Sequence, residues 1–117
     1  MTESQPWPRI AVVGAGAVGG YFGGLLARAG APVAMIGRPA FVEAVKKNGL
    51  FLDTLQFQEK VSVEASADIS TVRGAEVVLF CVKTTDNAST ARAIAPLLSN
   101  STLVVSMQNG EIGRAHV

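Results

Sequence analysis

A glycine motif near the amino terminus has the spacing that can hold a phosphate group. The pattern G-x-G-x-x-G is matched by six consecutive residues, Gly14, Ala15, Gly16, Ala17, Val18 and Gly19. It follows a short β-branched run, 9–13, and opens a stretch of helix formers, 17–29. In this context the first glycine permits a tight turn, the second lets the backbone approach a pyrophosphate, and the third allows close helix packing. Backbone N–H groups and the helix dipole then favour the anion, so we expect a dinucleotide site. The alternative is a turn that only packs a helix on a strand.

An arginine stands where a dinucleotide-binding domain for NAD usually has an acidic residue. The run 33–36 is predicted to be the second strand, and Gly37 and Arg38 follow it. A carboxylate at this place holds the ribose 2′-hydroxyl of NAD, whereas the planar guanidinium can pair with a 2′-phosphate. The pattern therefore favours NADP(H) over NAD(H). A solvated surface arginine is the alternative.

Two more polar residues follow predicted strands. Lys83 comes after the apolar run 77–82, and Asn109 lies just past the strand predicted at 102–106. Carboxyl ends of parallel strands face the cofactor crevice, where a lysine can contact phosphate, ribose or a substrate carboxylate. An asparagine offers both a donor and an acceptor to ligand hydroxyls. For each residue an ordinary polar loop position is an equal alternative, and the spacing does not decide between them.

The order of elements predicts an α/β fold of the Rossmann type, with a doubly wound, mostly parallel sheet. Strands are predicted at 9–13, 33–36, 77–82 and 102–106, helices at 17–29, 39–48 and 85–98, and two short strands within 50–64 around the polar stretch 56–60. Alternating strands and helices favour a parallel sheet with right-handed crossovers. Gly30 is expected to cap the first helix. Three further glycines of that helix, Gly20, Gly23 and Gly24, are expected to pack it against a neighbour.

Composition limits the possible classes. A chain of 117 residues that is 49% hydrophobic can form one compact domain. The net charge of +1 argues against nucleic acid as a partner, and we expect no bound metal. Apolar runs are shorter than the ~20 residues that span a bilayer, and residues 1–8 resemble a frayed tail more than a signal peptide. Cys81 is the single cysteine, so we expect a buried thiol, no intramolecular disulfide and a reducing, cytoplasmic location.

Four segments form a recognisable set. They are GAGAVGGYFGGLLARAG, Ile36–Gly37–Arg38, Phe80–Cys81–Val82–Lys83–Thr84, and Ser106–Met107–Gln108–Asn109–Gly110. Together they resemble the amino-terminal domain of the ketopantoate reductase (2-dehydropantoate 2-reductase) family over residues 9–110. The resemblance implies NADPH-dependent reduction of a small 2-keto acid, ketopantoate, to pantoate on the way to pantothenate and coenzyme A. It implies that Gly14 to Gly19 hold the pyrophosphate and Arg38 the 2′-phosphate. It places Lys83 and Asn109 on the nicotinamide side, with Asn109 also near substrate.

The same resemblance predicts that this chain lacks a helical second domain. In the family that domain supplies the lysine that acts as general acid and a substrate-binding carboxylate. We therefore expect no catalytic residue among these residues, an inactive fragment, and exposed apolar surface that makes it marginally soluble. The dinucleotide-binding domain is expected to span 9–110. Residues 111–117 back-translate to a common short-read sequencing adapter followed by a stop codon, so we expect a non-native tail in which His116 has no role; a true terminus is the alternative.

Two other functions stand beside this one. The first is another NADP-dependent reductase or dehydrogenase that acts on 2-keto or 3-hydroxy acids, against which the segments 81–84 and 108–110 argue. The second is a non-catalytic NADP(H)-sensing module, which a genuine stop codon after residue 117 would favour. Neither composition nor spacing selects an oligomeric state.

Overall fold

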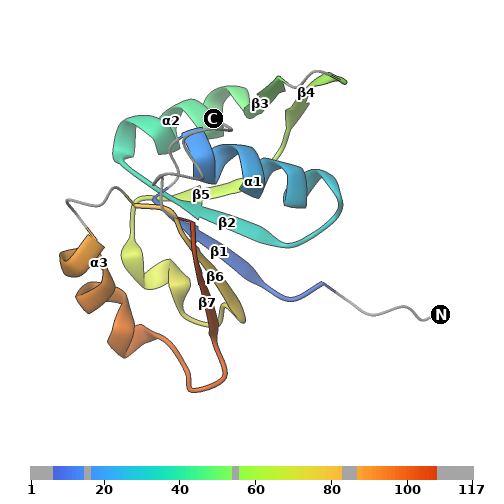
Figure 1. Cartoon of the computed structure of the whole chain (residues 1–117). Coiled ribbons are helices and arrows are strands. Elements are labelled where there is room, and N and C mark those ends of the chain that lie inside the picture. Colours follow the sequence, from blue (N-terminus) through green and yellow to red (C-terminus); the bar gives the residue numbers. More distant parts are fainter. Residues whose placement is uncertain (1–6, 15–16, 54–55, 83–86, 108–117) are drawn as a thin grey trace.

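The computed structural model describes residues 7–14, 17–53, 56–82 and 87–107, and its centre is a five-stranded parallel sheet (Figure 1). The strands are β1 (Ile10–Val13), β2 (Val33–Ile36), β5 (Glu64–Ser66), β6 (Val77–Phe80) and β7 (Leu103–Ser106). Their spatial order is β5-β2-β1-β6-β7. The first strand therefore lies in the middle and the chain winds outward in both directions, which confirms the predicted Rossmann-type, doubly wound fold.

Helices cover both faces of the sheet (Figure 1). One face carries α1 (Ala17–Arg28) and α2 (Pro39–Asn48), and the other carries η1 (Ile69–Val72), α3 (Asn87–Ile94) and η3 (Ala95–Leu97). None of the helices in the described part of the chain is long and apolar enough to cross a bilayer.

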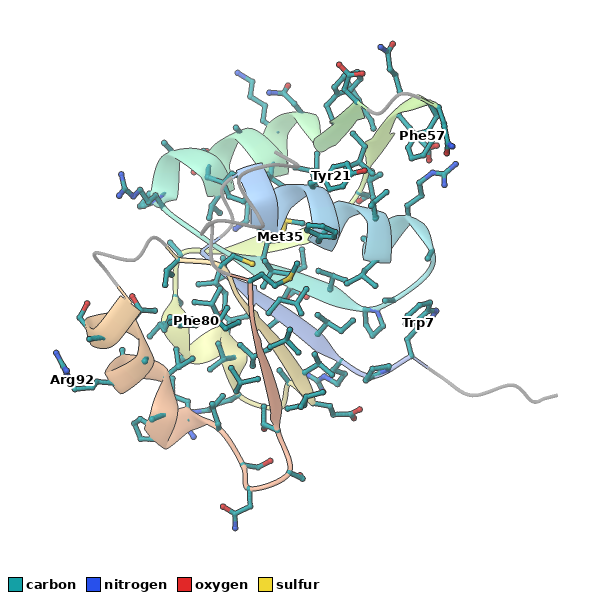
Figure 2. All side chains as sticks on the ribbon, in the orientation of Figure 1. Trp7, Tyr21, Met35, Phe57, Phe80 and Arg92 are labelled. Carbon is teal, nitrogen blue, oxygen red and sulfur yellow. The ribbon has the colours of Figure 1, made fainter. Side chains whose placement is uncertain are left out.

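Strand β1 holds the two halves of the core together. All four of its residues are buried, as a central parallel strand requires. Successive side chains point to opposite faces. Ile10 and Val12 therefore pack with Met35 beneath α1, as Figure 2 shows for Met35. Ala11 and Val13 pack on the side of η1 and α3.

An antiparallel hairpin is inserted between α2 and β5. Its strands, β3 (Leu50–Asp53) and β4 (Gln58–Val61), pair only with each other and pack against α1. Arg28 at the end of α1 contacts the hairpin: its Nε donates to Glu59 Oε1 at 2.9 Å, and its guanidinium lies 4.0 Å from the centre of the Phe57 ring.

The predicted elements differ from the observed ones in several places. Two strands within 50–64 are confirmed, but the polar residues 58–60, expected to separate them, belong to β4 because backbone pairing with β3 does not depend on side-chain polarity. The helix predicted at 85–98 is described from Asn87, and its last turn is the 3-10 helix η3, where Pro96 lacks the N–H of a regular turn. The tails predicted at 1–8 and 111–117 lie largely outside the described residues, because 1–6 and 108–117 are not described.

The crossover from β5 to β6 has no counterpart among the predicted elements. Glu64–Ser66 pairs with β2, and a single short 3-10 helix replaces the usual long crossover helix. Asp68 caps η1 by accepting hydrogen bonds from the Ser70 amide and hydroxyl at 3.0 and 2.8 Å. These bonds hold the pKa of the Asp68 carboxyl below its ordinary value, and the bond from the Ser70 backbone has a larger effect than the bond from its side chain.

Candidate functional site

The carboxyl ends of three neighbouring strands meet at one edge of the sheet. Gly14 follows β1, Gly37 follows β2 and Cys81 follows β6. Backbone hydrogen bonds continue past the strands: the Gly14 amide donates to the Ile36 carbonyl at 3.0 Å, and the Cys81 amide donates to the Val13 carbonyl at 2.8 Å. This edge is where open α/β sheets bind ligands.

Gly14 forms a turn that no other residue fits. Its φ is +86°, which L side chains rarely adopt, and a Cβ there would lie 2.7 Å from Val82 Cγ1 and 2.8 Å from the Val82 nitrogen. The tight turn predicted for the first glycine of the motif is therefore present. Ala15 and Gly16 lie outside the described residues, and α1 begins at Ala17.

Gly19 brings the first turn of α1 against the end of the sheet. A Cβ at this position would be 3.0 Å from the Gly14 carbonyl oxygen, 3.0 Å from Val12 Cγ1 and 3.3 Å from Cys81 Cβ. The close packing predicted for the third motif glycine is therefore observed. It holds the amino-terminal end of α1, which begins with Ala17 and Val18, at the carboxyl edge of the sheet.

Of the three later glycines of α1, Gly23 and Gly24 allow the helix to pack closely against its neighbours, as expected, and Gly20 does not. A Cβ on Gly23 would lie 2.6 Å from Met35 Cε, and one on Gly24 would lie 2.7 Å from Leu52 Cδ2. A Cβ on Gly20 would meet only Leu50 Cδ1 at 4.0 Å, an ordinary contact. Gly23 faces the sheet and Gly24 faces the hairpin, so α1 is wedged between the two.

Arg38 stands exposed between β2 and α2. It is the residue before the first turn of α2, with φ −70° and ψ 154°, and its carbonyl accepts from the Val42 amide at 3.0 Å. The first turn of α2 carries no acidic residue. Among the residues that the structure describes, the guanidinium has no ion-pair partner. A cation that has no carboxylate partner among the described residues can receive an anionic group.

Cys81 follows β6 and lies close to Gly19 in the first turn of α1. It is a free thiol of intermediate exposure, so the expected burial is only partly observed. Burial raises its pKa from the ordinary 9.0 to about 11, and the thiol is therefore neutral at physiological pH. A neutral, half-buried thiol acts as a packing group and not as a nucleophile.

Lys83 and Asn109 lie outside the described residues, but the chain that leads to each of them reaches this edge. Val82, directly before Lys83, lies against Gly14. Met107 extends β7 by one hydrogen bond, from its amide to the Phe80 carbonyl at 2.8 Å. Sequence reasoning singled out neither Val82 nor Phe41, which touches Gly37, because both belong to ordinary apolar patterns.

Two surface hollows that are lined by described residues lie elsewhere. One, of about 350 Å³, is lined by the end of α2 and by β4. A second, of about 140 Å³, is lined by residues at the amino ends of the strands, Arg9 and Pro32 among them. The candidate site is described by the strand ends and the glycine turn, and these two hollows are not part of it.

The strand order and the glycine turn after the central strand define a Rossmann-type α/β domain of the dinucleotide-binding class. The sequence model of the family "Ketopantoate reductase PanE/ApbA" matches residues 10–117, and the chain belongs to this family.

Individual relatives agree with this assignment. A 2-dehydropantoate 2-reductase of Mesorhizobium japonicum is 36% identical over 103 residues, which are 87% of this chain and 32% of that protein. The crystal structure of a PanE/ApbA family ketopantoate reductase from Ralstonia eutropha JMP134 matches with a TM-score of 0.83 and 50% identity, over 93% of this chain and 38% of that one. A D-mandelate dehydrogenase in ternary complex with NADH and anilino(oxo)acetate matches with a TM-score of 0.76 and 25% identity, over 92% of this chain and 35% of that one. The chain thus spans roughly a third of these relatives.

Proposed function

We propose that this chain is the NADP(H)-binding part of a reductase that converts 2-dehydropantoate to pantoate. The observation that carries the proposal is the edge itself, where the Gly14 turn, the start of α1 and the exposed Arg38 follow adjacent strands. Membership of the ketopantoate reductase family supports the reaction. A reducing, cytoplasmic location is part of the same proposal, and the free thiol of Cys81 agrees with it.

The described residues fit a dinucleotide. A Cβ at Gly14 would collide with Val82, and one at Gly19 would crowd the Gly14 carbonyl. Both positions therefore require glycine, and the backbone there carries no side chain that could cover it. A bare backbone at a helix start presents N–H groups to a phosphate. In the proposal Gly14, Ala15, Gly16, Ala17, Val18 and Gly19 hold the pyrophosphate.

Arg38 is proposed to select the cofactor. Its guanidinium is exposed and lacks a carboxylate neighbour in the first turn of α2, so it is free to pair with a 2′-phosphate in two parallel hydrogen bonds. Lys83 and Asn109 are proposed to line the nicotinamide side of the crevice, with Asn109 also near the 2-keto acid. NADPH supplies the hydride when it is bound. The residues of this chain bind and orient it, and the general acid is proposed to belong to the remaining part of the longer protein.

A second candidate is a reductase for another 2-keto acid. The match to a D-mandelate dehydrogenase that holds NADH and anilino(oxo)acetate supports it, since the same fold there is combined with another 2-oxo acid and with a cofactor that lacks the 2′-phosphate. Turnover of 2-dehydropantoate against aromatic 2-oxo acids by the full-length protein separates the two candidates.

The cofactor assignment is tested by Arg38→Ala in calorimetric titrations with NADPH and NADH. We expect NADPH affinity to fall about 10- to 100-fold, as for one charge-assisted bidentate pair, and NADH affinity to stay within about twofold. Arg28→Ala is the control, because Arg28 is bonded to Glu59 on the hairpin and is not part of the proposed site. Equal losses for both cofactors would remove the 2′-phosphate role, and absence of binding to either in the unmodified chain would overturn the proposal.

A further inference from the structure

We propose that Phe41 is a positioning residue that sets the preference for NADPH over NADH, because its ring holds the turn on which Arg38 stands. The inference rests on the proposed function, in which Arg38 binds the 2′-phosphate. Phe41 is in the first turn of α2, three residues after Arg38.

The ring of Phe41 occupies the space that a side chain at position 37 would fill. A Cβ on Gly37 would lie 3.0 Å from Phe41 Cδ2, 3.6 Å from Cγ and 3.7 Å from Cε2. Gly37 is not among the glycines with positive φ, so its backbone conformation is open to any residue. The glycine is therefore explained by the ring that covers it.

The backbone of the turn is held from two more directions. The Gly37 amide donates to the Ser66 carbonyl of β5 at 3.1 Å, and the Arg38 carbonyl accepts from the Val42 amide at 3.0 Å. Pro39, at the start of α2, restricts φ between these two bonds. The Phe41 ring completes the enclosure of the turn on the side toward the core.

The ring is itself firmly anchored. Phe41 is partly buried and packs against two core clusters, one that contains Val33 and Met35 of β2 and one that contains Val42 and Val45 of α2 with Ala65 of β5. It therefore links the position of the turn to β2, β5 and α2 together.

The Arg38 side chain has no such support. It is exposed, makes no capping hydrogen bond and has no ion-pair partner among the described residues. Its position relative to the strand ends is set by the backbone that carries it. Two parallel hydrogen bonds to a phosphate require close alignment, and a displacement of about 1 Å can weaken such a contact strongly. NADH lacks the 2′-phosphate and is indifferent to this displacement.

The test measures NADPH and NADH affinities of three variants by calorimetric titration. For Phe41→Leu, which removes the ring, we expect NADPH affinity to fall about five- to tenfold and NADH affinity to change less than about twofold. Phe41→Tyr keeps the ring and should retain the preference. Val45→Ala is the matched control, because it weakens the same helix packing one turn later without touching Gly37; it should leave the ratio of the two affinities unchanged.

A second variant addresses the contact itself and serves if Phe41→Leu fails to fold. Gly37→Ala places a Cβ 3.0 Å from the ring and should lower the preference for NADPH.

The outcomes separate the two proposals. If Arg38→Ala lowers NADPH affinity selectively but Phe41→Leu and Gly37→Ala leave the ratio unchanged, the positioning role is wrong and the cofactor assignment stands. If Phe41→Leu and Val45→Ala change the ratio equally, the effect is general loosening and the positioning role is again wrong. If Arg38→Ala leaves the ratio unchanged, the 2′-phosphate assignment fails and the role of Phe41 fails with it.

Discussion

The backbone of Val82 lies directly against Gly14, with 2.8 Å between the Val82 nitrogen and the place where a Cβ of Gly14 would be. The turn after the central strand thus lies in close contact with the segment that follows β6, where the nearest atoms belong to both the side chain and the backbone of Val82. Since Lys83 is the next residue after Val82, this contact brings the chain that carries the lysine to the glycine turn. It joins two segments of the proposed cofactor site that are distant in the sequence.

Gly14→Ala should destabilise the fold more than the loss of a positive-φ glycine alone. Gly49 is the matched control, because its φ of +79° is close to the +86° of Gly14 while its nearest neighbour, the Val61 carbonyl oxygen, would be 3.5 Å from a Cβ. We expect about 1–3 kcal/mol for Gly49→Ala from backbone strain, and a further contribution of about 1–3 kcal/mol for Gly14→Ala from the collision with Val82. Urea unfolding of both variants measures the difference. Equal losses would mean that the contact with Val82 can relax.

The glycines of α1 should respond to alanine in opposite directions. Gly20→Ala meets only an ordinary contact with Leu50 and should stabilise the chain by up to about 1 kcal/mol through helix propensity. Gly23→Ala collides with Met35 Cε and Gly24→Ala with Leu52 Cδ2, and both neighbours are fully buried or nearly so. We expect each to destabilise by about 1–2 kcal/mol after the propensity gain is subtracted. Thermal unfolding of the three variants checks the order; a stabilised Gly24→Ala variant would show that the hairpin does not press on α1.

Cys81 should make stability fall with rising pH above 9. Its folded-state pKa is raised by burial from 9.0 to about 11, so the unfolded chain loses the thiol proton first as pH rises. The contribution of the neutral thiol is therefore complete below pH 9.0 and is lost progressively up to about pH 11. Urea unfolding across this range, compared between the unmodified chain and Cys81→Ala, isolates the thiol from other groups that titrate there. The same pH dependence in both would contradict the raised pKa.

Strand β7 should make the chain self-associate. Leu103, Val104 and Val105 are 60%, 45% and 38% exposed, and they form the outer strand of the sheet in the described structure. An exposed apolar edge strand promotes association between chains. Sedimentation velocity should show association that increases with concentration, and Leu103→Lys should reduce it while changing stability by less than about 0.5 kcal/mol.

A control for this prediction is Phe51→Lys. Phe51 is 58% exposed and lies on the hairpin, outside the five-stranded sheet. The substitution therefore removes a similar apolar surface without changing the edge strand. Association that drops equally in both variants would indicate a general effect of charge, and a monodisperse monomer at every concentration would show that the exposed strand is harmless.

Some of the fold could be predicted because its signals are local. The apolar runs of β1, β2, β6 and β7 lie where the sequence places strands, within one or two residues. Gly30, with φ +107°, ends the first helix as the pattern indicates. Backbone conformation at a glycine and the burial of a continuous apolar run depend mainly on neighbouring residues.

Other elements could not be read from local patterns. Strand β5 consists of Glu64, Ala65 and Ser66 and exists because the backbone of β2 offers it hydrogen bonds. Polar β4 exists because β3 pairs with it. In both, a partner strand supplied by the fold outweighs weak intrinsic preference.

For the site, the sequence alone determined the chemistry that is available: the glycine spacing, the arginine in place of a carboxylate, and the polar residues after the strands. The tertiary structure decided what lies against what. It placed Val82 against Gly14 and the Phe41 ring beside Gly37, contacts that leave no room for a side chain at Gly14 and little room for one at Gly37. Residue types and spacing are properties of the chain, whereas the space around a glycine is created only when the strands and helices pack.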